Sequence, residues 1–278
     1  MRAAVVVLLL AAILASTPGT AVFAQGHTAG GSSTWLLGEW RARVEDLAAK
    51  LATELESSSA GALPSAMVVR RGPRSSGAVA LTFDDGYDIR ACASIARTLR
   101  QYDAVGTFFI NGQWLKRKPD RWRRILAGME FANHTRSHRD LTQEPHRVVV
   151  NQIRSNEYLH ETILGRPMLK VLRPPYGAYE DRIGRIARQL GYDHVVFWNV
   201  DSGDWKREAK PKRIVQAATG APPGSIVLMH CARQATAKAL PKIVRHYQER
   251  GIEVAGLSTV LEGAEDQGAE VAPKRYGG

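Results

Sequence analysis

Short apolar runs alternate with longer amphipathic stretches from residue 78 onward. Seven runs have the length and composition of buried strands, at 78–83, 106–110, 130–133, 170–173, 194–200, 225–230 and 252–257. Between most of them apolar residues recur at helical spacing, at 89–102, 121–127, 147–164, 181–190, 214–218 and 235–250. Alternation of strand and helix predicts parallel strands joined by crossover helices. About seven such repeats indicate an α/β protein, a distorted (β/α) barrel that is closed or incomplete, better than an open sheet.

The N-terminal stretch has the pattern of a targeting segment. Arg2 precedes an apolar run at 3–15, which is broken by Ser16 and Pro18, and "AVFA" then ends at Ala24. The run is shorter than the ~20 residues that a spanning helix needs. We therefore predict a signal peptide at 1–24, with an uncleaved N-terminal anchor as the alternative. A secreted or cell-wall-associated protein is expected.

The remaining chain divides by composition into three parts. Residues 25–77 are predicted to be a linker with one amphipathic helix, at 35–55, because breaker-rich stretches flank that helical pattern. A globular domain follows at 78–261. Residues 262–278 are polar and are predicted to be a flexible tail.

The chain carries a formal net charge of +11, which suggests an anionic neighbourhood such as a cell wall. Apart from "KRKPDRWRR" at 116–124 the cations are scattered, and export argues against nucleic acid as a partner. We expect no nucleic-acid partner, no stable membrane insertion and a monomer. The two cysteines, Cys92 and Cys231, are able to form a disulfide in an exported chain, but their positions in the sequence do not decide it.

Ionisable or otherwise distinctive residues follow five of the predicted strands. In chain order they are Asp84 and Asp85; His134 and His138; Pro175, Tyr176 and Gly177; Asp201, Asp204 and Trp205; and His230. The carboxyl ends of parallel barrel strands share one rim, where active sites form. Five strands therefore deliver functional groups to the same place.

Two of these groups predict a metal site. The imidazoles of "HTRSH" lie one turn apart if that stretch is helical. Two imidazoles and one carboxylate suit Zn²⁺ and leave positions open for water and substrate. One Asp of the neighbouring pair completes this set, and the other is left to take a proton from water. A bound cation also relieves the repulsion between the two carboxylates.

Five short motifs carry a resemblance to a known family. They are "TFDDG" (82–86), "HTRSH" (134–138), "RPPYG" (173–177), "DSGDW" (201–205) and "IVLMH" (226–230). In order and form they resemble the motifs of the NodB-like polysaccharide deacetylases, carbohydrate esterase family four, over about 78–260. The resemblance implies a NodB-like catalytic domain at 78–261 and hydrolysis of a carbon–nitrogen bond that is not a peptide bond.

The resemblance also implies a role for each position. Asp85, His134 and His138 would hold a divalent metal, zinc with cobalt as the alternative, and Asp84 would be the general base. The remaining roles are orientation of the base by Arg173, protonation of the leaving amine by His230, an oxyanion contact from the Tyr176 N–H, and walls of the acetyl pocket from Trp205 and Leu228. Asp204 would pair with Arg173 or with His230. Cys231 stands where the family often has Asp.

The expected substrate is an N-acetylated glycan. The leading hypothesis is removal of acetyl groups from N-acetylglucosamine in peptidoglycan or chitin-type glycans. One alternative is an O-acetyl esterase that acts on xylan with the same site. The other is a wall-glycan-binding module without activity, against which the complete set of motif residues argues.

Overall fold

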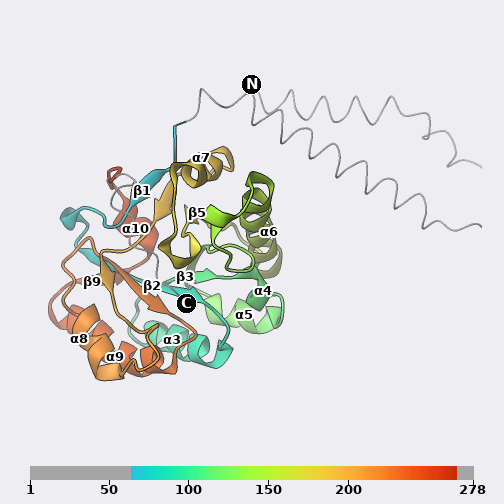
Figure 1. Ribbon diagram of the computed structural model, residues 1–278. Helices are drawn as coiled ribbons and strands as arrows, with labels where there is room; N and C mark the ends of the chain where they lie inside the picture. The colour runs from blue at the N-terminus through green and yellow to red at the C-terminus, as the bar shows by residue number, and fades with distance from the viewer. Residues whose placement is uncertain (1–63, 268–278) are drawn as a thin grey trace, which may run out of the picture. The chain divides into compact units, whose positions relative to one another are not determined.

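The computed structural model describes residues 64–267 (Figure 1). Its strands are β1 Met67–Val69, β2 Ala78–Asp85, β3 Thr107–Ile110, β4 Glu130–Asn133, β5 Leu169–Leu172, β6 His194–Val196, β7 Val200–Asp201, β8 Ile226–His230 and β9 Glu253–Ala255. Its helices are α3 Ile89–Gln101, α4 Gly112–Leu115, α5 Pro119–Leu126, α6 His146–Leu164, α7 Asp181–Gln189, α8 Pro211–Ala218, α9 Gln234–Glu249 and α10 Leu257–Leu261. The predicted signal peptide and the predicted helix at 35–55 lie outside the described residues.

The strands of the described chain form one sheet of nine strands, in the order β1–β6–β5–β4–β3–β2–β8–β7, with β9 paired to β2. Every pairing between these strands is parallel. Helices lie around this sheet, as crossover connections between parallel strands require (Figure 1). The predicted distorted (β/α) architecture is confirmed.

The predicted strand at 194–200 is two strands instead of one. The chain leaves β6 at Val196 and joins the other side of the sheet as β7, beside β8. In between, the Phe197 N–H donates to the Val69 carbonyl and the Asn199 N–H to the Ile226 carbonyl. Residues 197–199 thus connect the β1–β6 side of the sheet to the β8 side, so the apolar run changes its partner strand part-way.

Both predicted domain limits differ from the described structure. The apolar run of β1 has only three residues and lies in the predicted linker at 25–77, yet it pairs with β6. At the other end, the Val68 N–H donates to Asp266 and the Gln267 N–H donates to the Val68 carbonyl. The predicted tail is therefore hydrogen-bonded to β1 as far as Gln267. This is possible because β1 is an edge strand, whose outer backbone groups have no neighbouring strand to bond.

Successive side chains of β2 alternate between two clusters of buried residues, one beneath the outer helices and one inside the barrel. Val79, Leu81 and Phe83 pack with residues of α3 and α9, whereas Ala78 and Ala80 pack with residues of the other strands. Since side chains on a strand alternate between the two faces, Asp84 shares the inner face with these alanines. Small residues at the inner positions leave room for polar side chains at the rim.

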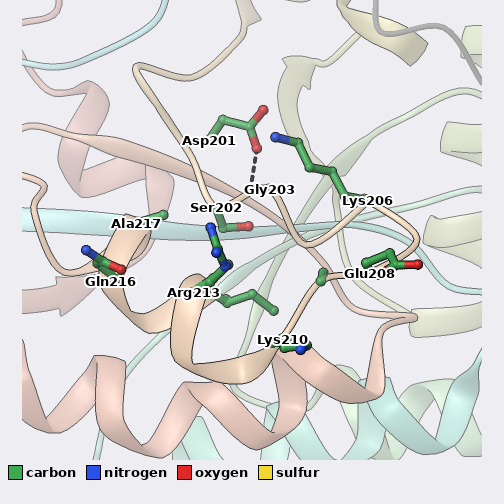
Figure 2. Close-up of a pocket in the computed structure, with 11 residues that line it drawn as sticks. Asp201, Ser202, Gly203, Lys206, Glu208, Lys210, Arg213, Gln216 and Ala217 are labelled. Atoms are coloured by element: carbon green, nitrogen blue, oxygen red, sulfur yellow. Dashed lines mark hydrogen bonds between the residues drawn. The ribbon is translucent and has the colours of Figure 1, made fainter.

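The segment that joins β7 to α8, together with residues of α8 itself, lines a surface hollow (Figure 2). Within residues 64–267, no helix has the length and apolar character needed to cross a bilayer.

Candidate active site

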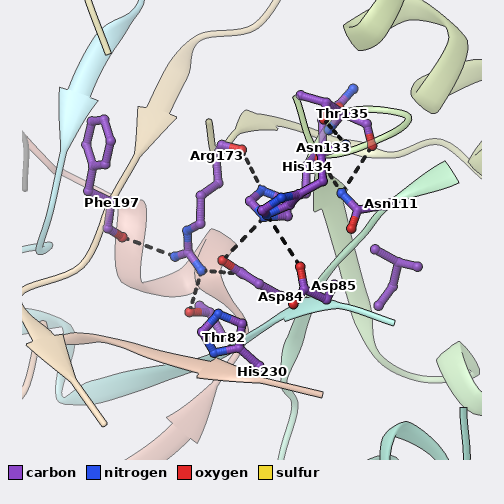
Figure 3. Close-up of polar contacts among 12 residues, drawn as sticks. Thr82, Asp84, Asp85, Asn111, Asn133, His134, Thr135, Arg173, Phe197 and His230 are labelled. Carbon is purple, nitrogen blue, oxygen red and sulfur yellow. Dashed lines mark hydrogen bonds and ion pairs between the residues drawn. The ribbon is translucent and has the colours of Figure 1, made fainter. Parts of the chain in front are cut away.

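A pocket of about 670 Å³ opens where the strands end. Its lining contains all the predicted site residues except Arg173 and Asp204, namely Asp84, Asp85, His134, His138, Tyr176, Trp205, Leu228 and His230. Arg173 is buried and contacts Asp84 (Figure 3). Asp204 is also buried and contacts His230. The structure therefore brings all ten predicted residues together.

Asp84 is held by a buried guanidinium. Arg173, which is fully buried, donates from Nη1 to Asp84 Oδ1 at 2.8 Å and to Thr82 Oγ1 at 2.8 Å. Its Nη2 donates to the Phe197 carbonyl at 3.1 Å. Burial lowers the pKa of Arg173, and the charge of Asp84 opposes that change. The ion pair compensates the buried carboxylate and fixes its direction, as predicted for a base-orienting residue.

Asp85 reaches the same pocket by a change in backbone conformation. Alternation along β2 would turn its side chain away from the inner face that carries Asp84. Its φ of 78° lies in the left-handed region, which few non-glycine residues adopt. As a result, Asp85 Oδ1 lies 3.5 Å from His138 Nε2. Two consecutive carboxylates thus line one pocket.

The two histidines meet without a helix between them. Residues 134–138 contain a bend at 136–137 and no helix, so the two histidines are not placed one helical turn apart as the sequence spacing suggested. Thr135 and His138 have φ values of 64° and 58°, and these turns bring the two imidazole centroids to 5.0 Å. His134 Nδ1 lies 2.7 Å from the Arg173 carbonyl, to which its N–H donates, leaving Nε2 available as a ligand.

The donor set of Asp85, His134 and His138 fits a divalent metal. Their ligand atoms all lie within 4.8 Å of one another. The 3.5 Å between Asp85 and His138 is close to the ~3.4 Å edge of a tetrahedron with zinc bonds of ~2.1 Å. Burial and the neighbouring His134 lower the pKa of His138 to about 4, so its imidazole is neutral, the form that binds metal.

His230 is paired with Asp204, which decides between the two partners left open by the sequence. His230 Nδ1 lies 2.7 Å from Asp204 Oδ1, and the His230 backbone N–H donates to Asp204 Oδ2 at 2.7 Å. Burial disfavours a charged imidazole, but the Asp204 charge and hydrogen bond outweigh it and raise the pKa of His230 to about 9. The same pairing lowers the pKa of Asp204, against the opposing effect of burial. His230 is therefore an imidazolium at neutral pH.

Three predicted contact residues surround these charged groups. Tyr176 has a φ of 61°, and the backbone bonds of its turn are donated by Gly177 and Ala178 instead of by its own N–H. Trp205 donates its indole N–H to the Asp201 carboxylate, which fixes the ring as a wall. Leu228 is buried on β8 at the floor of the pocket.

Asn111 is a positioning residue that the sequence reasoning missed. Its backbone N–H donates to the Asp85 carbonyl at 3.1 Å, and its Nδ2 donates to the His134 carbonyl at 2.6 Å. Asn111 thus connects the two segments that supply the candidate metal ligands. The available signal was a polar residue directly after the apolar strand run "GTFFI".

Two further residues belong to the site and carried no recognised motif. Thr236 donates its hydroxyl to Asp204 Oδ2 and so completes the environment of the His230 partner. Tyr87 is 47% exposed at the pocket lining, a suitable surface for stacking on a sugar ring.

Cys92 and Cys231 form a disulfide, with their Cα atoms 4.5 Å apart. The bond joins α3 to the residue that directly follows His230. The Cys231 N–H also donates to the Asp84 carbonyl at 3.0 Å. Cys231 is therefore structural, and the residue that departs from the commonest family pattern helps to hold Asp84 and His230 in place.

Comparison with known proteins agrees with this geometry. The family model described as polysaccharide deacetylase matches residues 71–195. The chain is 30% identical to a peptidoglycan-N-acetylglucosamine deacetylase of Bacillus cereus, over 71% of this chain and 94% of that protein. It is 34% identical to a chitooligosaccharide deacetylase of Azorhizobium caulinodans, over 54% of this chain and 71% of that protein. The chain belongs to the polysaccharide deacetylases, a family of hydrolases.

Solved structures show the same fold. A peptidoglycan N-acetylglucosamine deacetylase superposes with a TM-score of 0.67 at 29% identity, covering 73% of this chain and 96% of that one. A CE4 family pseudoenzyme from Bacillus anthracis superposes with a TM-score of 0.66 at 26% identity, covering 71% of this chain and 69% of that one. The fold is therefore shared by active and inactive proteins, and activity has to be argued from the site.

Proposed function

We propose that this protein is a secreted, zinc-dependent deacetylase that hydrolyses the acetamide of N-acetylglucosamine in a cell-wall or chitin-type glycan. One observation carries the proposal: a compensated carboxylate, Asp84, and a charged imidazole, His230, both line a pocket that contains a complete Asp–His–His donor set. This combination provides a base, an acid and a Lewis-acid site within one pocket.

Asp85, His134 and His138 would hold the metal, which when bound supplies a Lewis acid that polarises the acetyl carbonyl and acidifies water. Asp84 takes the proton from the attacking water, with Arg173 fixing the direction of its carboxylate. A positioned base contributes roughly 10²–10⁴-fold to the rate.

His230 acts on the leaving group. An amide nitrogen is a poor leaving group as an anion, so it has to be protonated as the carbon–nitrogen bond breaks. With its Nδ1 side bonded to Asp204 and its pKa raised to about 9, His230 carries that proton at neutral pH. The products are a free amine and acetate.

The Tyr176 N–H is the proposed donor to the oxyanion, because the bonds of its own turn do not use it. An oxyanion donor contributes about 3 kcal/mol to transition-state stabilisation. Trp205 and Leu228 are the proposed walls for the acetyl methyl group, since both line the pocket and Leu228 adds an apolar floor beside the charged groups.

The names of the relatives support an N-acetylated glycan as the substrate, because one acts on peptidoglycan and another on chitooligosaccharides. Removal of O-acetyl groups from xylan would use the same attack. An inactive glycan-binding module is the third candidate, because the pseudoenzyme among the fold neighbours shows that inactive proteins share this fold. Base, acid and ligand residues together favour activity here.

Export is supported by two observations. The N-terminal pattern is that of a signal peptide, and the Cys92–Cys231 disulfide suits an oxidising compartment. We propose a secreted or wall-associated monomer.

The test is acetate release by the purified chain from residue 25 onward. The protein is stripped of metal and assayed with and without Zn²⁺ or Co²⁺ on chitin oligosaccharides, peptidoglycan and acetylxylan. Release that needs metal and that Asp84→Asn abolishes is expected, with Asp193→Asn, at an exposed position that lines neither pocket, as a matched carboxylate control. No release from any substrate by protein with one bound metal would instead support a binding module.

A further inference from the structure

A second hollow adjoins the active-site pocket. It has a volume of about 710 Å³ and is lined by the segment from β7 into α8 (Figure 2). Lys206 lines both this hollow and the active-site pocket. Trp205, which lines the active-site pocket, is bonded through its indole N–H to Asp201, which lines the hollow. A glycan bound with one sugar at the metal ligands therefore has this hollow as a neighbour.

The hollow is lined by three cations, Lys206, Lys210 and Arg213. All three side chains are exposed, and none makes an ion pair in the described part of the chain. Of the two carboxylates in the lining, Asp201 is oriented by the Gly203 N–H at 2.8 Å and by Trp205. Two more cations, Arg207 and Arg233, line the active-site pocket together with Lys206. The other carboxylate of the hollow is Glu208, so its three cations outnumber its two carboxylates, and Lys206 extends the positive charge to the active-site pocket.

We propose that Lys206, Lys210 and Arg213 form a subsite for carboxylates attached to the glycan beside the sugar that is deacetylated. This inference rests on the proposed deacetylase function and specifies its substrate class. Peptidoglycan carries a lactyl group and a peptide with free carboxylates on alternate sugars, whereas chitin and acetylxylan have none. The subsite thus selects the acid-substituted glycan over neutral ones.

The physical basis is charge pairing at a solvent-exposed site. Guanidinium and ammonium groups donate hydrogen bonds to carboxylates, and such bonds are stronger than those between neutral groups. Exposed pairs are each weak and are screened by salt. Several of them in one hollow favour association of an anionic ligand and have little effect on a neutral one.

The experiment compares Lys210→Gln/Arg213→Gln with the wild type on two substrates of equal sugar number. One is a peptidoglycan fragment with its peptide, and the other is a chitin oligosaccharide. We expect KM for the peptidoglycan fragment to rise about 3- to 10-fold, with kcat nearly unchanged and KM for the chitin oligosaccharide within about 2-fold. The effect should shrink as salt is raised.

The matched control is Lys212→Gln/Lys238→Gln, which also removes two positive charges, but from exposed positions that do not line the hollow. This variant should behave like the wild type. An equal loss on both substrates, or the same loss in the control variant, would overturn the subsite.

A binding measurement separates this inference from the proposed function. Asp84→Asn protein is titrated calorimetrically with both fragments, with and without the Lys210→Gln/Arg213→Gln changes. Tighter binding of the acidic fragment that those changes weaken supports the subsite even if no acetate is ever released. Equal affinities for both fragments overturn it even if the protein proves to be a deacetylase.

Discussion

Asp84 and His230 are register partners on the neighbouring parallel strands β2 and β8. Adjacent strands lie about 4.8 Å apart, so the two side chains leave the same face of the sheet at the same height. One is compensated by Arg173 and the other by Asp204. The proposed base and acid thus lie side by side, where both can reach a single acetamide group. Each is held by its own buried partner, Arg173 or Asp204.

The Asp204 partner should set the alkaline limit of activity. His230 must be protonated to act, and its pKa is raised to about 9, so kcat of the wild type should fall as pH rises through about 9. In Asp204→Asn burial still disfavours the imidazolium, and only the more weakly acting charges of Asp85 and Asp84 oppose it, so the alkaline limb should move to lower pH. Measured at pH 8, kcat should drop by roughly 10²-fold.

The exposed acid Asp193 provides the control, because Asp193→Asn should leave the pH profile unchanged. The pairing also predicts the pH dependence of stability. A raised pKa stabilises the fold fully below the unfolded value of about 6.5, and this contribution is lost as pH rises through about 9. An unchanged alkaline limb in Asp204→Asn would contradict the assignment of His230 as the acid.

His138→Ala should remove metal binding. The variant keeps one imidazole and one carboxylate of the donor set, too few for a closed site. After dialysis against Zn²⁺, we expect about one metal per wild-type chain and far less in the variant, as measured by atomic emission. Added Zn²⁺ should raise the melting temperature of the wild type only. His246→Ala, outside the pocket, is the control, and equal metal content in both variants would argue against the site.

Asn111→Ala should weaken metal binding without removing a ligand. Loss of the side-chain bond to the His134 carbonyl frees the loop that carries both histidines. By analogy with other residues that support metal ligands, the dissociation constant for Zn²⁺ should rise about 10- to 100-fold. Saturating metal should restore most of kcat. Asn151→Ala, an exposed position on α6, is the control, and a lower melting temperature with unchanged metal affinity would assign Asn111 to the fold alone.

Much of the site was predictable because its residues follow apolar strands. Asp84, Arg173 and His230 were identified from short motifs, and parallel strands bring such positions to one rim. The partner of Asp204 was not predictable, because it depends on how β7 and the following loop pass β8. Asn111 was missed because a single Asn after a strand has no distinctive pattern.

The fold was predictable where a regular apolar pattern extends over many residues. β1 escaped detection because three apolar residues between breakers resemble a linker. The run at 194–200 read as one strand, since the sequence does not show that Phe197 to Asn199 leave β6 for β8. The helical spacing of "HTRSH" was misleading for a related reason: Thr135 and His138 adopt left-handed conformations that tertiary contacts impose.

Replacement of Cys92 and Cys231 should lower stability more than activity. The disulfide closes a loop with a sequence separation of 139 residues, and loops of that size contribute about 3–5 kcal/mol to the free energy of unfolding. In Cys92→Ser/Cys231→Ser, urea denaturation should show this loss, while kcat stays within a few-fold because Asp204 still holds His230. Reductant should reproduce the loss in the wild type and have no effect on the variant.

The position of β2 between β3 and β8 has a consequence for the order of assembly. The proposed base, the proposed metal ligands and Arg173 all precede β8 in the chain, whereas the proposed acid His230 and the apolar residue Leu228 lie on β8 itself. Contacts between such distant segments form late, because a long loop has to close first. A nascent or truncated chain that ends before β8 therefore lacks His230 and Leu228. The pocket is complete only after β8 has joined the sheet, and the Cys92–Cys231 disulfide then fixes the residue next to His230.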